Sequence, residues 1–134
     1  MRQTSRLITG AGAVLALVGS LALSTPALAA GKAPSEEDCK AKPSGNVAEG
    51  GCLVVDRRKG NCGACHAIEG VPLAGNIAPP LNYMSQRFPD RAKLRAQIWD
   101  ATKFNPNSSM PPFGRHGILS EDEIDKVVDF VLTL

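Results

Sequence analysis

The pentapeptide Cys62–Gly63–Ala64–Cys65–His66 decides the fold of this chain of 134 residues. It sets two thiols three positions apart and puts an imidazole directly after the second thiol. Gly, Pro and Asn dominate the segment that contains the pentapeptide, residues 60–83, and a later segment, residues 105–117. Both segments are therefore predicted to have mostly irregular backbone. With only 4% aromatic residues, a small chain with so much loop lacks a centre to pack around. The pentapeptide indicates what fills that centre.

The spacing C-x-x-C-H is the signature of covalent haem attachment. Two thiols at this spacing can reach the two vinyl groups on one edge of a porphyrin. The adjacent His66 can then turn its imidazole beneath the ring towards the iron. We therefore predict one covalently bound haem c, attached through Cys62 and Cys65, with His66 as an axial ligand of the iron.

Three other interpretations of the two thiols have specific requirements. A thioredoxin-like motif would need a βαβ context, and the sequence shows no convincing strand. A structural zinc site would also need Cys39 and Cys52, whose spacing does not form a zinc knuckle. A disulfide between Cys62 and Cys65 would leave the neighbouring His66 unexplained.

The first residues have the layout of a secretory signal peptide. Arg2 and Arg6 precede an uncharged apolar run over 7–23, and Ala27–Leu28–Ala29 offers a cleavage site. The alternative is a transmembrane anchor, for which the run is long enough. We predict that residues 1–29 are a signal peptide and that the mature chain has no membrane span. Covalent haem attachment takes place on the far side of the bacterial membrane, so the predicted location is the periplasm.

Composition excludes several other classes of protein. The 15 basic and 13 acidic residues give a formal charge of +2 and form no dense basic run, so no nucleic-acid partner is expected. Removal of the signal peptide takes away two basic residues and no acidic one, which leaves a mature charge near zero. The length suits one small domain and is too short for a barrel enzyme.

The mature chain is predicted to be an all-α domain with three to five helices and long loops. Residues 30–45 read as a flexible N-terminal arm, and residues 46–134 as the haem-binding domain. Within this domain, helices are expected over 46–59, 89–101 and 120–134. The last is the clearest, because Ser120 and Glu123 form a capping box and the following apolar residues recur at helical spacing.

The second axial position of the iron has three candidate ligands. Met110 lies in a loop stiffened by the prolines that follow it, which would hold a thioether at low entropic cost. Met84 also reads as a packing residue, and His116 as a surface histidine. On the other side of the ring, the carbonyl of Pro79 could accept a hydrogen bond from Nδ1 of His66. Pro79 and Leu81 would then support the haem pocket. The alternative is that this Pro-Leu turn is only a rigid turn with no role at the haem.

These elements occur in the order found in the class I cytochrome c family. A first helix, C-x-x-C-H, a Pro-Leu turn, further helices, a methionine loop and a C-terminal helix follow one another. The resemblance implies the class I cytochrome c fold, in which the first and last helices cross. Gly50 or Gly51 would then meet Phe130.

A closer resemblance is to the SoxX family, the monohaem cytochrome subunits of the sulfur-oxidation system. It extends over nearly all of residues 50–134 and is clearest in residues 59–68, 74–81, 98–100, 105–106 and 110–115. The family's thioether cysteines fall on Cys62 and Cys65, and its iron ligands on His66 and Met110.

Membership would imply specific partners. SoxX proteins form heterodimers with the cytochrome SoxA, and the complex is L-cysteine S-thiosulfotransferase, which joins thiosulfate to a cysteine of the carrier SoxYZ. The resemblance assigns the sulfur chemistry to SoxA, so no catalytic residue is expected on this chain. Its role would be to pass the electrons to a soluble cytochrome. The alternatives are a free-standing cytochrome that shuttles electrons between respiratory complexes, and a haem enzyme or gas sensor with an open iron site.

Two further groups of residues and one tryptophan have open roles. Cys39 and Cys52 are left over in an oxidising compartment, which favours a disulfide between them; a bond to a partner protein and free thiols are the alternatives. Arg57, Arg58 and Lys59 precede the haem motif and either dock an acidic partner or form a solvated helix face. Trp99 either donates a hydrogen bond to a haem propionate or packs in the core.

Overall fold

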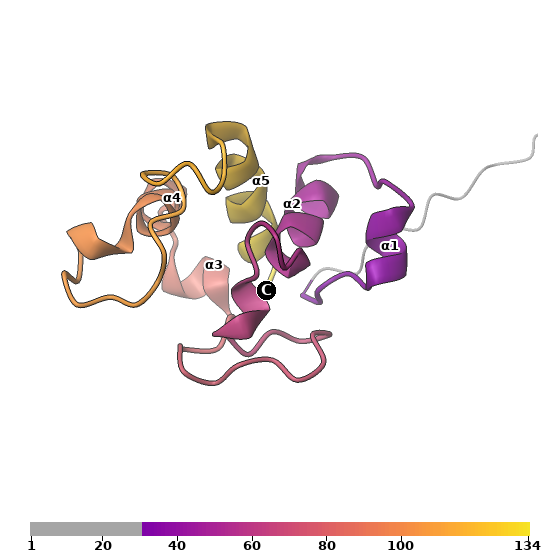
Figure 1. Ribbon diagram of the computed structural model, residues 1–134, viewed down its shortest axis with the longest axis horizontal. Helices are drawn as coiled ribbons and strands as arrows, with labels where there is room; N and C mark the ends of the chain where they lie inside the picture. Colours follow the sequence, from indigo (N-terminus) through magenta and orange to yellow (C-terminus); the bar gives the residue numbers. More distant parts are fainter. Residues whose placement is uncertain (1–30) are drawn as a thin grey trace, which may run out of the picture.

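The computed structural model describes residues 31–134, so the predicted signal peptide (residues 1–29) lies outside the described residues. This part of the chain forms an all-α fold, as predicted (Figure 1). The α-helices are α1 (Glu36–Lys40), α2 (Asn46–Val55), α3 (Met84–Arg87), α4 (Arg91–Trp99) and α5 (Glu121–Val131), and the 3-10 helices are η1 (Cys62–Ala64) and η2 (Ala101–Lys103). Residues 31–134 contain no β-strand, only an isolated parallel bridge between His66 and Ala78.

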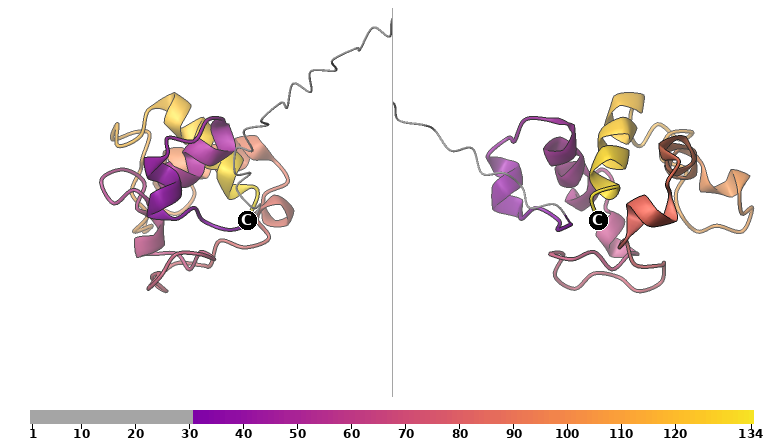
Figure 2. Two further views of the ribbon diagram at one scale, coloured as in Figure 1. Left: turned by 90° about the vertical axis from the view of Figure 1, so that its right-hand side faces the viewer. Right: turned by 180° about the vertical axis from the view of Figure 1, so that it is seen from behind.

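Helices α2 and α5 lie against each other and form the centre of the domain (Figures 1 and 2). Two adjacent glycines of α2 permit the close approach. A Cβ on Gly50 would collide with the carbonyl group of Lys126, and one on Gly51 would lie 3.0 Å from the ring of Phe130. The predicted contact with Phe130 is therefore confirmed for Gly51, whereas Gly50 meets the backbone of Lys126.

Helix α5 buries more core residues than any other helix in residues 31–134. The predicted capping box is present, because Ser120 Oγ accepts from the Glu123 amide and the Glu123 carboxylate accepts from the Ser120 amide. The residues it buries recur at helical spacing: Ile124, Val127, Val128, Phe130 and Val131. Burying such side chains contributes roughly 1.5–3 kcal/mol each relative to exposure.

The segment predicted as a flexible arm contains a short helix. Ser35 and Asp38 form a capping box that starts α1. This helix-start signal was missed in the sequence, because the surrounding residues are rich in Lys and Pro. Cys39 of α1 and Cys52 of α2 are joined by a disulfide with an S–S distance of 2.08 Å. Closing a loop of this length contributes about 3 kcal/mol in the chain-entropy model. The amide of Ala33 also donates to the carbonyl of Glu69 at 2.8 Å, so this segment is fastened to the domain at two points.

Helix α4 packs against α5 through ion pairs as well as apolar contacts. Asp90 caps it by accepting from the Ala92 amide, and its buried residues are Leu94 and Ile98. Arg91 and Arg95 both pair with Asp125 of α5, at 3.1 and 3.0 Å. Helix α3, which the sequence did not predict as a separate element, is a single turn before α4. In residues 31–134, no helix combines the length and the apolar character needed to cross a membrane.

Candidate haem site

The attachment turn is formed by the pentapeptide itself, over η1. The carbonyl of Cys62 accepts hydrogen bonds from the amides of Cys65 at 3.2 Å and His66 at 3.0 Å. Both thiols are free and partly buried. Burial raises the pKa of the Cys62 thiol to about 12, so this sulfur stays protonated at neutral pH. A thiolate-based redox or metal site would instead need a lowered pKa.

His66 is oriented by the contact that the sequence predicted. Its Nδ1 lies 2.6 Å from the carbonyl oxygen of Pro79. A carbonyl can only accept, so Nδ1 carries the proton and donates it. The lone pair of the neutral ring is then on Nε2, which is the atom and the tautomer that a metal binds.

The segment from residue 66 to residue 83, here the proximal loop, is fastened to the attachment turn by backbone hydrogen bonds. Gly75 donates to the carbonyl of Gly63 at 2.8 Å, and Ala78 donates to the carbonyl of Cys65 at 3.1 Å. A Cβ on Gly75 would collide with the carbonyl group of Ala64. The loop therefore lies in direct contact with the backbone of the turn, and Pro79 reaches His66 from it.

The other predicted residue of this loop, Leu81, is partly buried and packs against the core. Its amide donates to the carbonyl of Ala67 at 2.9 Å. The structure thus brings five predicted residues together at one place, namely Cys62, Cys65, His66, Pro79 and Leu81.

Met110 lies in a second segment, residues 100–117, here the distal loop, which Figure 1 shows at the left of the molecule. Its side chain is partly buried against the core, and its amide donates to Ser108 Oγ at 3.2 Å. Met84 is in a different environment, because it is 3% exposed within the core and its sulfur accepts from the Arg87 guanidinium at 3.3 Å. His116 is exposed. Ligation of the iron by Met110 remains a prediction that these environments favour.

Both ends of the distal loop are held by Asp100, which sequence reasoning did not single out. Its carboxylate is 2% exposed. It accepts from the amide and hydroxyl of Thr102, at 3.1 and 2.5 Å, and pairs with Arg115 at 3.2 Å. The Thr102 hydroxyl, its amide and the Arg115 charge together hold the pKa of Asp100 below its ordinary value. An Asp two residues before a Thr is a turn signal, but nothing in the sequence indicates Arg115 as the partner.

Trp99 completes the closure of this loop. Its carbonyl accepts from the amides of Gly114 at 3.1 Å and Arg115 at 3.3 Å. A Cβ on Gly114 would collide with the indole ring, and the Arg95 guanidinium lies 5.5 Å from the ring centroid. Trp99 thus has a packing role in closing the distal loop.

The donor set of this chain fits a c-type haem. It provides two free thiols at the attachment spacing, an imidazole with its Nε2 lone pair available and a thioether in a loop closed at both ends. A zinc site does not fit, because Cys39 and Cys52 are consumed by their disulfide. Across residues 31–134, no group of three or more His, Cys, Asp or Glu side chains could hold a metal ion.

An all-α fold with crossed α2 and α5 helices and a C-x-x-C-H turn defines a c-type cytochrome. The family model of cytochrome c oxidase, cbb3-type, subunit III matches residues 54–131. This is more than half of the chain, and the protein therefore belongs to that cytochrome family. It has the class I cytochrome c fold and is an electron-transfer cytochrome.

Two relatives make the comparison more specific. The crystal structure of SoxXA from P. pantotrophus is 30% identical in sequence, with a TM-score of 0.59 over 67% of this chain and 82% of that chain. The protein is thus SoxX-like. An uncharacterized lipoprotein of Aquifex aeolicus (strain VF5) is 35% identical over 75 residues, which are 55% of this chain and 36% of the lipoprotein. The chain spans about a third of that relative. The family and the lipoprotein relative indicate a location outside the cytoplasm.

Proposed function

We propose that this protein is the electron-transfer subunit, SoxX, of a periplasmic SoxAX complex, the L-cysteine S-thiosulfotransferase. The observation that carries this proposal is the similarity to SoxXA, which covers most of the matched chain at 30% identity. The attachment turn, the oriented His66 and the closed methionine loop support it. In this proposal, residues 1–29 are a signal peptide, residues 30–45 an N-terminal arm and residues 46–134 the cytochrome domain with one haem.

The proposed reaction of the complex is an oxidative coupling. A cysteine thiol of SoxYZ and the outer sulfur of thiosulfate form a sulfur–sulfur bond, and the thiol loses its proton. Two electrons are released. SoxA receives them at the site of coupling, and this chain passes them, one at a time, to a soluble cytochrome.

The residues of this chain have holding and orienting roles. Cys62 and Cys65 would hold the haem covalently through thioether bonds, and His66 Nε2 and the Met110 sulfur would bind its iron. When bound, the haem supplies a one-electron iron couple, and histidine–methionine ligation raises its potential. If His66 and Met110 both hold the iron, it would offer substrate no open site, and the proposal assigns no catalytic residue to this chain.

The test is reconstitution of the complex with the full chain matured in a periplasm that attaches haem. Thiosulfate added to SoxYZ and the heterodimer with SoxA should reduce the haem of this chain. Omission of SoxA or of SoxYZ should abolish the reduction. A chain that binds no SoxA yet exchanges electrons with respiratory cytochromes would instead be a free-standing shuttle.

A separate measurement tests the closed iron site. Carbon monoxide added to the reduced protein at neutral pH should bind weakly, because Met110 occupies the position it needs. Strong binding would contradict the proposed ligand set and favour a haem enzyme or sensor.

A further inference from the structure

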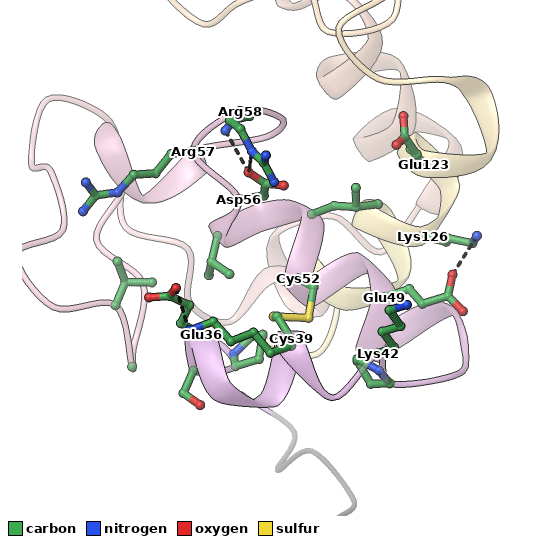
Figure 3. A pocket seen from close by; sticks show the side chains of 18 of the residues that line it. Glu36, Cys39, Lys42, Glu49, Cys52, Asp56, Arg57, Arg58, Glu123 and Lys126 are labelled. Carbon is green, nitrogen blue, oxygen red and sulfur yellow. Dashed lines mark hydrogen bonds and ion pairs between the residues drawn. A yellow bond between two sulfur atoms is a disulfide. The ribbon is translucent and has the colours of Figure 1, made fainter.

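A broad hollow lies between α1, α2 and residues 70–73, on the side of the molecule that carries the disulfide (Figure 3). Its volume is about 1380 Å³, which exceeds the roughly 300–1,000 Å³ usual for small-molecule sites. A hollow of this size suits a segment of another protein. The haem site described above does not use it.

One wall of the hollow displays an apolar side chain at an unfavourable backbone position. Leu73 is 102% exposed, and its φ of 54° lies in the left-handed region. Branched and bulky residues rarely adopt that conformation. Backbone strain combined with full exposure is typical of residues whose role is contact with a partner rather than folding. Val71 and Pro72 line the same wall.

Five cations and four carboxylates line the hollow, an excess of one positive charge. Four carboxylates line it, and each is paired with a cation: Glu36 with Lys40 at 3.1 Å, Glu49 with Lys126 at 2.8 Å, Asp56 with Arg58 at 3.5 Å and Glu123 with Lys59 at 2.9 Å. Two further lining cations, Lys42 and Arg57, form no ion pair within residues 31–134. Figure 3 shows the Arg57 side chain pointing away from Asp56.

The three consecutive basic residues before the haem motif, Arg57, Arg58 and Lys59, therefore differ in their ion pairing. Lys59 and Arg58 are engaged with acidic residues of this chain, whereas Arg57 is exposed at the hollow. The lining cations outside these ion pairs are therefore Arg57 and Lys42, and Figure 3 shows them on opposite sides of the disulfide.

The hollow also adjoins the attachment turn. A Cβ on Gly63 would lie 2.8 Å from Cγ1 of Val71, and Gly63 stands between the two haem-binding cysteines. A bound protein segment that contacts Val71 would thus be separated from the attachment turn only by the Val71 side chain. Electron transfer between proteins requires such short paths to the cofactor.

We propose that this hollow is a docking site for an acidic segment of an electron-transfer partner protein, with carboxylates at Arg57 and Lys42 and an apolar side chain over Leu73. The charge of the hollow and the composition of its wall define this occupant. The proposal rests on the electron-transfer role of the protein and is independent of thiosulfate chemistry.

The test uses the reduced, diamagnetic holoprotein and a synthetic peptide of alternating glutamate and leucine. NMR titration should shift the resonances of Arg57, Lys42 and Leu73 together. A peptide with lysine in place of glutamate, and one with alanine in place of leucine, should both bind more weakly. Shifts centred outside the hollow would overturn the proposal, and binding of the lysine peptide at equal strength would do the same.

Matched variants separate docking from general electrostatics. Arg57→Glu should weaken binding of the peptide about fivefold, as expected for a lost surface ion pair. Lys93→Glu, an exposed cation on α4, should leave binding unchanged. An equal loss in both variants would show a nonspecific charge effect and refute the site.

Leu73→Asn tests the apolar contact without endangering the fold. Asparagine tolerates left-handed backbone better than leucine, so the variant should be at least as stable as the original protein. Peptide binding should nevertheless weaken measurably. Unchanged binding in a folded variant would remove the apolar contact from the proposal. Because this titration needs only the present chain, failure of the sulfur-oxidation role would not affect its outcome.

Discussion

The two loops that carry the proposed iron ligands are held in different ways. The proximal loop is fastened to the attachment turn by main-chain hydrogen bonds, with Gly75 in contact with the turn itself. The distal loop is also closed by main-chain hydrogen bonds, from the Gly114 and Arg115 amides to the Trp99 carbonyl. It has in addition a charged contact, the ion pair between the buried carboxylate of Asp100 and Arg115. Main-chain contacts vary little with pH and depend on the absence of a Cβ, whereas the closure by Asp100 depends on charge.

The difference fits the strength of the two proposed ligands. A histidine must be oriented as well as held, and the short hydrogen bond from Nδ1 to Pro79 does so. A thioether is a weak iron ligand, and the distal loop must therefore be restrained before the haem binds. We expect steric conflict at Gly75 to disrupt the proximal loop and loss of charge at Asp100 to loosen the distal loop only in part.

The largest effect should come from Gly75→Ala. The new methyl group would meet the carbonyl group of Ala64, and backbone on both sides leaves no room to yield. We expect a loss of about 3 kcal/mol or more in the free energy of unfolding, measured by denaturant titration of the holoprotein. Asn76→Ala, an exposed neighbour in the same loop, is the control and should change little.

Removal of the proposed ligand Met110 should abolish one spectroscopic signal of the haem completely and leave the fold intact. Met110→Ala should abolish the sulfur-to-iron charge-transfer band of the oxidised protein, measured by absorption at the red end of the visible spectrum. Met84→Leu should retain the band, because that sulfur is engaged with Arg87 in the core. The opposite result would identify Met84 as the ligand.

Asp100→Asn should loosen the distal loop without removing the ligand. The amide can still accept from Thr102 but loses the ion pair with Arg115. We expect partial loss of the same absorption band. Asp90→Asn makes the same change at the cap of α4, outside the loop, and should leave the band intact. Equal bands in both variants would show that Asp100 does not restrain Met110.

The smallest effect is a difference in pH dependence. Because hydrogen bonds and the Arg115 charge lower the pKa of Asp100 in the folded state, its carboxylate stabilises the fold above the unfolded pKa. That contribution disappears as the pH falls through the folded pKa, below about pH 4. The stability difference between the original protein and Asp100→Asn should therefore be constant near neutral pH and vanish in acid. A stability difference that persists in acid would mean that Asp100 stabilises the fold through its packing and not through its charge.

Prediction from sequence succeeded where local chemistry was sufficient. The capping box at Ser120 and the apolar stripe of α5 follow from neighbours in the chain, and the structure has both. The contact between His66 and Pro79 was expected from the turn that follows the haem motif, and it is present. The helix at α1 was missed, although Ser35 and Asp38 carry the same kind of local signal.

Other features depended on partners that are distant in sequence. Arg57, Arg58 and Lys59 look alike along the chain, yet Lys59 pairs with Glu123, 64 residues away, and Arg57 has no such partner within residues 31–134. Likewise, from the sequence Met84 and Met110 could be compared as iron ligands only by the stiffness of their loops. The structure shows that Met84 is buried in the core.

By itself, the sequence determined the helical class and predicted a c-type haem, its two attachment thiols and its histidine ligand, because each depends on residues a few positions apart. Only the tertiary structure decided that a buried Asp100 closes the distal loop, that Gly75 touches the attachment turn, and which cations are available at the hollow beside it. Burial and ion pairing join residues from separate segments, and their free energies are set by the surroundings that folding creates.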